Sequence, residues 1–360
     1  MLQILLIISF LVGNIKKFSL FFSESRVSLL DISIGGIFLF FLYKKHRIIG
    51  AKPVLNFIII SLVSLLISGS HYGLSAMIVG SFYIIRWSTY NSLPFLVSIP
   101  KKSSILFYLG LTTVLISLAQ YFFYPDIRNL AIAEWDPHYY RVVGSLLDPG
   151  YTGLMLVFFL TFLTLNKNWL LWGLTYITMA LTYSRSSYLA YLIAMAYLAW
   201  RIRGWKFFVT TATLLFVTLP LLPRPPGGEG VKLERRFSIQ ARIDNWRQTW
   251  TIFADHPILG VGFNTYRYAQ KNYSFSGDGD RWLKSHAGAG ADSSLLFVLA
   301  TTGIIGFYFY LRYLKYLYSF PNLRYYLIPL FFHSFFLNSL FYPFVMVWIA
   351  LVVSMEHNEP

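Results

Sequence analysis

Two arginines in the second half of the chain have side chains suited to an anionic substrate. Arg185 follows Ser184 in TYSRSSYLA, and Arg242 lies in ARIDNWRQTW, three positions before Asn245 on a predicted helix. A guanidinium matches the paired oxygens of a phosphate or pyrophosphate better than any other side chain. Each arginine also has a plainer interpretation, because one at the end of an apolar segment can reach the membrane interface and one on a helix surface can pair with a neighbouring acid.

Two residues near a run of small side chains are candidates for a general base. His286 and Asp292 flank the sequence AGAGA. A histidine that titrates near neutral pH, or a partly desolvated carboxylate, can accept the proton of a hydroxyl group. The nearby acids Asp278 and Asp280 suggest a cation site, but the EF-hand pattern fails because Ala289 stands where glutamate is required. We therefore expect an ordinary turn there, and no metal or cofactor.

The rest of the chain is too apolar for a soluble domain. Of its 360 residues, 56% are hydrophobic and 12% are charged, against roughly 25% charged in an average soluble domain. Cysteine is absent, which excludes disulfides, thiol catalysis and cysteine-ligated metals. The net charge of +15 would suggest nucleic acid in a soluble protein, whereas here it indicates membrane topology and an anionic ligand. We therefore expect membrane lipid, and no nucleic acid, as a partner.

The apolar runs predict an all-α polytopic membrane protein with about 12 transmembrane helices. The first predicted segment is the weakest, because Lys16 and Lys17 interrupt it. The last two predicted segments could form one helix kinked around Asn338 and Pro343. The predicted segments lie near residues 3–22, 27–43, 53–69, 71–99, 102–124, 149–165, 168–184, 186–201, 205–222, 293–318, 323–338 and 340–354.

Clustered cations predict the orientation of these helices. Lys and Arg concentrate in alternate short connections, which places those connections and both termini in the cytoplasm. The long loop 223–292 then lies outside. This plan divides the chain into helices 1–9 (residues 1–222), one partly helical extracytoplasmic loop (223–292) and helices 10–12 (293–360). The N-terminal stretch has no basic start and no cleavage site, so we expect part of a first span and not a cleaved signal peptide.

The long loop contains a predicted amphipathic helix. Residues 235–256 have a helical pattern, which Pro257 ends. Such a helix can lie at the level of the lipid headgroups, and His256 is expected to have a structural role at its end. Gly260 and Gly262 permit positive φ or a close backbone approach, without the context of a dinucleotide fingerprint. The predicted apolar face carries Ile243, Trp246, Trp250 and Phe253.

Four segments, taken in order, resemble the O-antigen ligase and O-antigen polymerase superfamily of bacterial membrane glycosyltransferases. This resemblance implies a GT-C-like fold in the bacterial cytoplasmic membrane and an undecaprenyl-pyrophosphate-linked glycan as donor. A hydroxyl of a glycan or lipid-anchored sugar acceptor would attack its anomeric carbon on the outer face, with inversion and without a metal. The segments are RVVGSLLDPGYTG (141–153), LTYSRSSYLA (181–190), ARIDNWRQTWTIFADHPILGVGFNTY (241–266) and DSSLLFVLATTGIIG (292–306).

The resemblance also implies roles for individual residues. Arg185 and Arg242 would bind the pyrophosphate, with Ser184 beside them and Arg141 at the mouth of the pocket. Counted back from Gly303, the position that histidine usually fills in the ligases is Asp292 here. His286 lies six residues earlier. Both remain candidates for the base, and both ligase and polymerase remain open.

A transporter or flippase for a lipid-linked sugar is the alternative. Such a protein would be expected to carry ionisable groups or broken helices near the middle of its spans. The acid inside the early predicted spans is Asp31, near the start of a span, while the other ionisable residues gather on one side. This asymmetry favours chemistry at the membrane surface.

Overall fold

The computed structural model describes residues 2–15, 17–19, 26–44, 52–97, 104–129, 136–273 and 290–357. The regular structure of these residues is almost entirely helical, and strands β1 (Lys17–Ser19) and β2 (Arg26–Ser28) pair as a short antiparallel hairpin. The chain divides into two compact units, each assembled from three stretches of sequence. Unit 1 contains residues 1–16, 102–236 and 322–333, and unit 2 contains 17–101, 237–321 and 334–360.

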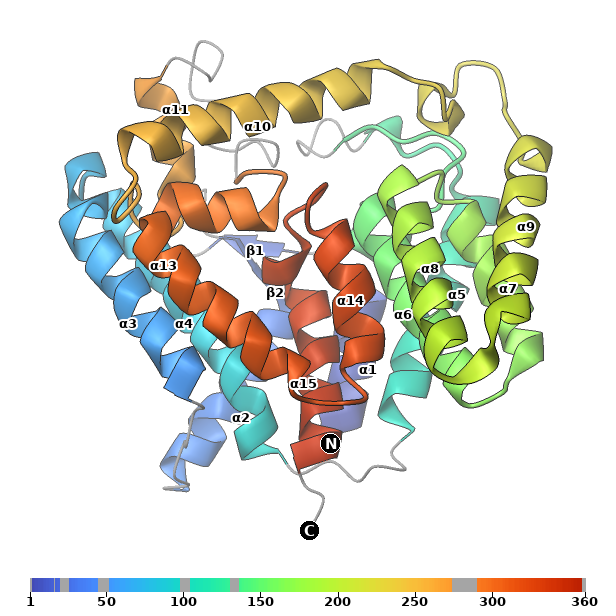
Figure 1. Cartoon of the computed structure of the whole chain (residues 1–360), viewed down its shortest axis with the longest axis horizontal. Helices are drawn as coiled ribbons and strands as arrows, with labels where there is room; N and C mark the ends of the chain where they lie inside the picture. Colours follow the sequence, from blue (N-terminus) through green and yellow to red (C-terminus); the bar gives the residue numbers. More distant parts are fainter. Residues whose placement is uncertain are drawn as a thin grey trace. The chain divides into compact units, whose positions relative to one another are not determined.

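Unit 1 is built around helix α6 (Pro149–Leu165), whose residues are mostly buried. A helix that is apolar on all sides belongs inside a bundle, and α6 packs against α5, α7 and α8 (Figure 1). A π-helical turn, Ala199–Arg203, follows α8. The other helices are α1 (Leu2–Val12), α5 (Ile105–Phe123), α7 (Trp169–Ala180), α8 (Arg185–Leu198), α9 (Trp205–Leu221), α14 (Arg324–His333) and the short η3 (Gly144–Leu146) and η5 (Glu229–Val231).

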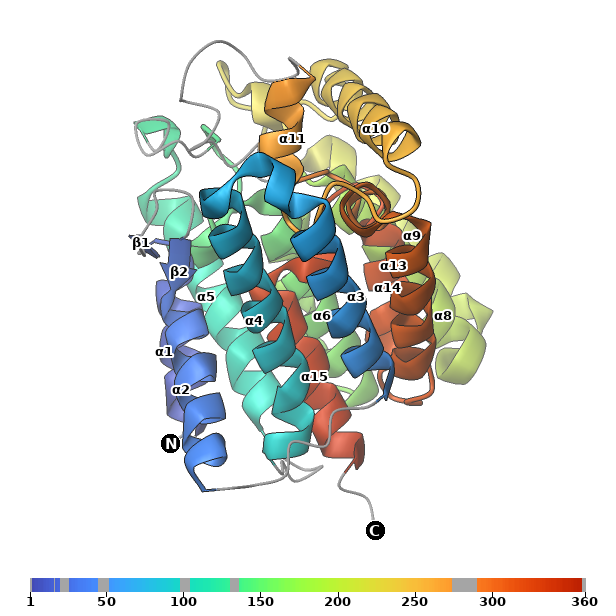
Figure 2. The same cartoon turned by 90° about the vertical axis from the view of Figure 1, so that its left-hand side faces the viewer.

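Unit 2 is organised around helices α4 and α13. In it, α4 packs against α2, α3 and α15, and α13 packs against α3 and α10 (Figure 2). Helix α10 lies crosswise to α3 and α4 (Figure 1). The helices are α2 (Leu29–Tyr43), α3 (Lys52–Ile67), α4 (Leu74–Leu96), α10 (Phe237–Asp255), α11 (Tyr266–Asn272), α13 (Ser294–Tyr318), α15 (Pro343–His357) and the short η1 (Gly69–Tyr72) and η7 (Ser339–Phe341).

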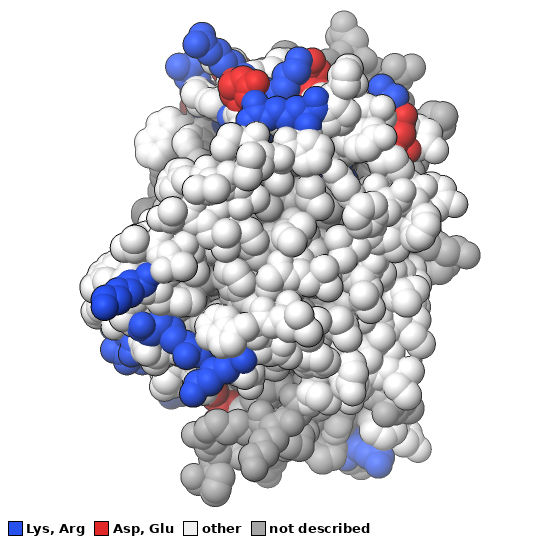
Figure 3. Space-filling model, turned by 90° about the vertical axis from the view of Figure 1, so that its right-hand side faces the viewer, with Lys and Arg blue, Asp and Glu red and all other residues white. Residues whose placement is uncertain are grey.

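The helices have the composition of a membrane protein. Among the described residues, α5 and α13 are long and apolar enough to cross a membrane, and several shorter helices are also apolar. Figure 3 shows charged side chains at two opposite ends of one face and a broad uncharged band between them. Along α9 of unit 1, Arg203 precedes the helix and Arg224 follows it. This distribution fits a helix whose middle lies in an apolar layer.

Each of the twelve predicted segments contains a helix, but several boundaries differ from the prediction, and two of these differences have identifiable reasons. The first segment was expected to continue to residue 22, whereas α1 ends at Val12. Gly13 turns the chain with φ +53°, and a Cβ at this position would lie 2.2 Å from the carbonyl oxygen of Ser145. The seventh was expected to continue to residue 184, whereas α7 ends at Ala180 and Tyr183 adopts φ +49°. The last two segments form separate helices, α14 and α15.

Candidate active site

The first group of site residues lies at the N-terminus of α8 in unit 1. The first amide groups of a helix have no partner within it, and a preceding serine commonly satisfies one of them. Ser184 is this N-cap residue, and its Oγ accepts from the backbone N–H of Ser187 at 3.4 Å. The Ser187 hydroxyl donates to Ser184 Oγ at 2.8 Å. Arg185 is therefore the first residue of α8, at the positive end of the helix dipole, where anions bind favourably.

Three arginines surround the turn before α8. Arg141 is buried, and its Nε donates to the carbonyl oxygen of Thr182 at 3.0 Å. Arg235 Nη2 donates to the carbonyl oxygen of Tyr183 at 3.3 Å. Arg185 Nη1 in turn donates to the carbonyl oxygen of Arg235 at 3.2 Å. Backbone carbonyls orient a guanidinium without cancelling its charge, so these contacts gather positive charge around the start of α8.

The pKa of a buried histidine is lowered next to these arginines. Burial, together with the charges of Arg141 and Arg235, lowers the pKa of His138 from 6.5 to about 3. The imidazole is 8% exposed and neutral at physiological pH. Its Nε2 has no hydrogen-bond partner in the part of the chain that the structure describes. His138 was not among the predicted site residues, because nothing in the sequence HYYR marks its proximity to Arg235.

Asp148, next to the same cluster, has a structural task. Its Oδ1 accepts from the backbone N–H groups of Gly150 at 2.7 Å and Tyr151 at 2.9 Å, which caps α6. Burial raises the pKa of Asp148, while the two amide contacts and the charge of Arg141 act in the opposite direction. Its carboxylate therefore holds the DPG segment at the start of α6.

The second group of site residues lies on and beside α10 in unit 2. Asn245 Oδ1 accepts from the backbone N–H of Asp292 at 2.8 Å. Arg242 precedes Asn245 by three positions, so the two side chains share a face of the helix. Within the described residues, Arg242 makes no hydrogen bond and no ion pair. The structure therefore fixes Asp292 against the helix that presents the Arg242 guanidinium.

A buried tyrosine lies close to the Asp292 carboxylate. The phenol of Tyr266 forms a 2.7 Å hydrogen bond with the Thr249 hydroxyl of α10. Burial raises the pKa of Tyr266 to about 12, the Thr249 contact lowers it, and the negative charge of Asp292 raises it. Tyr266 keeps its proton at physiological pH, so Asp292 is the candidate base of the pair.

The glycines of HPILGVGF and TTG hold α10 and α13 together. Helix α13 is kinked at Gly303, where φ is +64° and ψ is −168°. The segment after α10 pairs with this kink: Val261 N–H donates to the Ala300 carbonyl at 2.9 Å, and Ile304 N–H donates to the Pro257 carbonyl at 2.8 Å. A Cβ on Gly303 would lie 2.2 Å from the carbonyl oxygen of Ile258. This backbone contact links α10, with Arg242, to the helix that begins just after Asp292.

The predicted helix in the long loop is confirmed, but its predicted apolar face is displaced. The buried positions of α10 are Thr249 and Ile252, whereas Trp250 of the predicted stripe is 56% exposed. Trp246 contacts the Phe336 ring at a centroid distance of 6.1 Å. The side chains that face unit 2 are Asn245, Thr249 and Ile252. Each lies one position before a residue of the predicted face. His256 ends the helix through its backbone N–H, which donates to the Ile252 carbonyl at 3.2 Å.

The structure thus brings the predicted site residues together in two groups. Unit 1 gathers Arg141, Ser184 and Arg185, and unit 2 gathers Arg242 and Asp292. His286 and the Asp278–Asp280 turn lie outside the described residues. Arg235 stands at the start of the predicted helical pattern 235–256, but it precedes α10 and donates to the Tyr183 carbonyl, 52 positions away. Its partner is a backbone group, which no sequence pattern reveals.

Comparison with known proteins finds a family model that matches part of the chain. No curated protein matches the chain. Residues 169–311 match the family model described as O-antigen ligase. This stretch begins with α7, ends within α13, and includes the N-terminus of α8, Arg242 and Asp292. Over residues 169–311, this match confirms the resemblance found in the sequence.

Proposed function

We propose that the chain is an O-antigen ligase- or polymerase-like glycosyltransferase for surface polysaccharide biosynthesis. Its donor is an undecaprenyl-pyrophosphate-linked oligosaccharide, used on the outer face of the bacterial cytoplasmic membrane. The observation that carries the proposal is the arginine cluster at the N-terminus of α8. Arg185 is held there by backbone carbonyls at the positive end of a helix, inside the stretch that matches the family. Such a place suits the charge of a pyrophosphate.

The proposed reaction is a single displacement at the anomeric carbon. An oxygen of the acceptor sugar forms the new bond, the bond to the pyrophosphate oxygen breaks with inversion, and the leaving pyrophosphate takes the electron pair. Guanidinium groups stabilise the charge that develops on it, and we assign this role to Arg185 and Arg242. No metal takes part in this scheme. Metal independence is tested by assaying transfer with a chelator present.

The hydroxyl proton needs an acceptor, and the two candidates are Asp292 and His286. Asp292 is supported by its position, because its backbone is bonded to Asn245 on the face of α10 that also carries Arg242. Substituting Asp292→Asn keeps the size of the side chain and removes its basicity, and His286→Ala removes the imidazole. We expect the variant that lacks the base to lose transfer while its membrane level is unchanged. Full activity in both variants would rule out both residues as the base.

The alternative is a transporter or flippase for a lipid-linked sugar. The observation in its favour is the pair of Asp31 and Arg86, which lies between helices α2 and α4. This pair differs from a cargo relay because both carboxylate oxygens already accept hydrogen bonds from side chains of the same unit. We therefore retain glycosyl transfer as the better-supported function.

An electrophoretic profile of surface glycan from cells without the protein tests the proposal and separates its two forms. Loss of the ladder with single repeat units retained identifies a polymerase. Accumulation of long lipid-linked polymer that never reaches its acceptor identifies a ligase. A normal profile, or one restored by an unrelated flippase, would contradict glycosyl transfer.

A further inference from the structure

A group of cations lies at one end of unit 1, where helices α6 and α8 end and helices α7 and α9 begin. Lys167 is in the turn between α6 and α7, Arg203 precedes α9, and Lys206 is in the first turn of α9. Aromatic contacts bring them together. The guanidinium carbon of Arg203 lies 5.4 Å from the centre of the Trp169 ring, which lies 6.3 Å from the Phe207 ring. Lys167, Arg203 and Lys206 form what we name the basic cluster.

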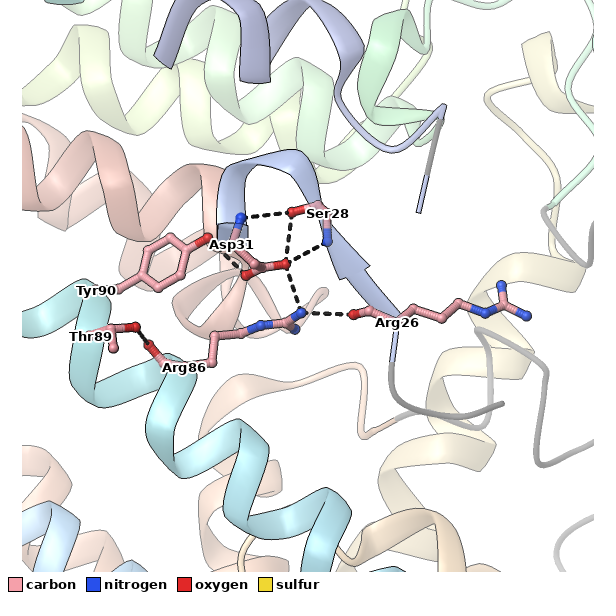
Figure 4. A network of polar contacts seen from close by, with 6 residues as sticks. All are labelled: Arg26, Ser28, Asp31, Arg86, Thr89 and Tyr90. Atoms are coloured by element: carbon pink, nitrogen blue, oxygen red, sulfur yellow. Dashed lines mark hydrogen bonds and ion pairs between the residues drawn. The ribbon is translucent and has the colours of Figure 1, made fainter. Parts of the chain in front are cut away.

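No carboxylate balances the basic cluster in the part of unit 1 that the structure describes. The ammonium groups of Lys167 and Lys206 are exposed and make no hydrogen bond or ion pair within the described residues. Arg86 of unit 2 differs, because its guanidinium pairs with the carboxylate of Asp31 (Figure 4). The described acids of unit 1 follow α5, precede α6 or follow α9, at the other end of these helices: Asp126, Asp136, Asp148, Glu229 and Glu234.

Arg203 has a structural part in the cluster, and the two lysines do not. Its Nη2 donates to the carbonyl oxygen of Thr164, in the last turn of α6, and its guanidinium lies over the ring of Trp169 at the start of α7. Arg203 also ends the π-helical turn between α8 and α9. Replacing it would disturb the ends of several helices. The two lysines can therefore be changed without breaking a contact that the structure describes.

An apolar surface begins beside the basic cluster and follows α7. Leu170, Leu174 and Ile177 are exposed and spaced i, i+4 and i+7, so they share one face of this helix. In a membrane protein, an exposed apolar face of this kind contacts acyl chains. Trp169, at the start of the same helix, is 48% exposed, and tryptophan is enriched where a membrane meets water. The basic cluster therefore lies at the level of the lipid headgroups.

The charge and the apolar surface together define the ligand. A phospholipid has a phosphate at the headgroup level and hydrocarbon beside it, and lysines near a membrane surface attract anionic lipids. We propose that the basic cluster binds the headgroup of an anionic phospholipid, with Lys167 and Lys206 on its phosphate and an acyl chain along α7. A zwitterionic headgroup adds a cation that the lysines repel. This site lies at the end of α8 opposite to Arg185, apart from the proposed glycosyl transfer.

The experiment measures lipid binding to the purified full-length protein in detergent by native mass spectrometry. We expect dioleoylphosphatidylglycerol to bind about tenfold more tightly than dioleoylphosphatidylcholine, which has the same chains. The double variant Lys167→Gln with Lys206→Gln should lose about this factor and bind both lipids alike, with an unchanged melting temperature. Lys167→Arg with Lys206→Arg keeps the charge and should bind like the natural protein.

The matched control removes two cations from the other end of unit 1. Arg224 and Lys232 are exposed and already pair with Glu234 and Glu229. Arg224→Gln with Lys232→Gln makes the same change in net charge, and we expect normal binding of dioleoylphosphatidylglycerol. Equal losses in the two glutamine variants, or no loss in the Lys167 and Lys206 variant, would overturn the proposal.

Two fragments of the lipid separate the contributions of charge and hydrocarbon. Glycerophosphoglycerol carries the headgroup without chains, and dioleoylglycerol carries the chains without phosphate. We expect neither to compete with dioleoylphosphatidylglycerol at equal concentration. Competition by glycerophosphoglycerol would make the basic cluster a site for soluble anions, and competition by dioleoylglycerol would make its charge irrelevant; either result overturns the assignment. All of these measurements are independent of glycosyl transfer.

Discussion

Arg141 and Arg86 are both largely buried, but different groups hold them. In unit 1, Arg141 donates to the carbonyl oxygens of Thr182 and Tyr183, and Arg185 donates to carbonyl oxygens as well. In unit 2, Arg86 pairs with the carboxylate of Asp31 at 2.8 Å. A carbonyl is a neutral acceptor, whereas a carboxylate cancels the charge of its partner.

The charge in the two regions also differs in its observed effect. Around the start of α8, the positive charge remains strong enough to contribute to the low pKa of His138. Around Arg86, the carboxylate of Asp31 already balances the positive charge. We therefore associate the first region with the pyrophosphate and regard the second as a structural ion pair.

The largest effect is expected from removing the carboxylate in unit 2. Asp31→Ala leaves Arg86 largely buried without a counter-charge, and breaking a buried pair in this way costs about 3–5 kcal/mol. The unfolding free energy of the purified protein in detergent measures this. The double variant Asp31→Leu with Arg86→Met should recover most of the loss, because two apolar side chains can replace a buried pair. A stable single variant would show that Arg86 is not held as described.

Removing the cations that we assign to the pyrophosphate should instead affect activity. We expect Arg185→Ala and Arg242→Ala each to lower transfer about 10²–10³-fold, because each removes stabilisation of the leaving pyrophosphate. Transfer from lipid-linked donor to acceptor in membranes measures this, together with the amount of folded protein.

The matched controls are Arg224→Ala in unit 1 and Arg247→Ala on α10. Both side chains are exposed. Arg224 pairs with Glu234 and Arg247 pairs with Asp244, each with 3.8 Å between the charged atoms, so we expect near-normal transfer. Retention of near-normal product by Arg185→Ala or Arg242→Ala would contradict the assignment of that residue to pyrophosphate binding.

The pH dependence of stability tests the burial of His138 and the charge around it. Because the pKa of His138 falls from 6.5 unfolded to about 3 folded, the unfolded chain binds one more proton between these values. Stability should therefore decline as the pH falls from 6.5, by about 1.4 kcal/mol per pH unit relative to a His138→Gln variant, or about 2 kcal/mol at pH 5. Denaturation in detergent at several pH values measures this, and identical profiles would show that His138 titrates normally.

The apolar run predicted helix α6 in full, and local capping residues explain where it begins. Asp148 caps it, Pro149 occupies its first position, and the observed helix has the predicted bounds of 149–165. The boundary of α1 was not predictable in the same way, since the turn at Gly13 depends on contact with Ser145. Boundaries set by neighbouring residues can be found in the sequence, and those set by distant contacts cannot.

The same distinction applies to the sites. Ser184 and Arg185 could be predicted because a serine before a helix and an arginine at its first position are neighbours in the sequence. The bond between Arg86 and Asp31 joins residues 55 positions apart, and its acid was taken as a lone residue near a span start. Arg235 was misplaced for the same reason. Residue types alone identified the cations but not the groups that hold them.

The smallest expected effect comes from adding a carboxylate at the start of α8, where it would lie beside an arginine as Asp31 lies beside Arg86. Ser184→Asp places a carboxylate beside Arg185, and aspartate caps a helix about as well as serine does. Because Ser184 is buried, the amount of folded protein is measured together with transfer. The added negative charge opposes a pyrophosphate, and we expect about a tenfold loss of transfer. Ser184→Asn is the matched control, because it caps the helix without charge and should keep most of the activity. If Ser184→Asp transfers as well as Ser184→Asn, the charge at the start of α8 does not determine donor binding, and the contrast between the two regions has no functional meaning.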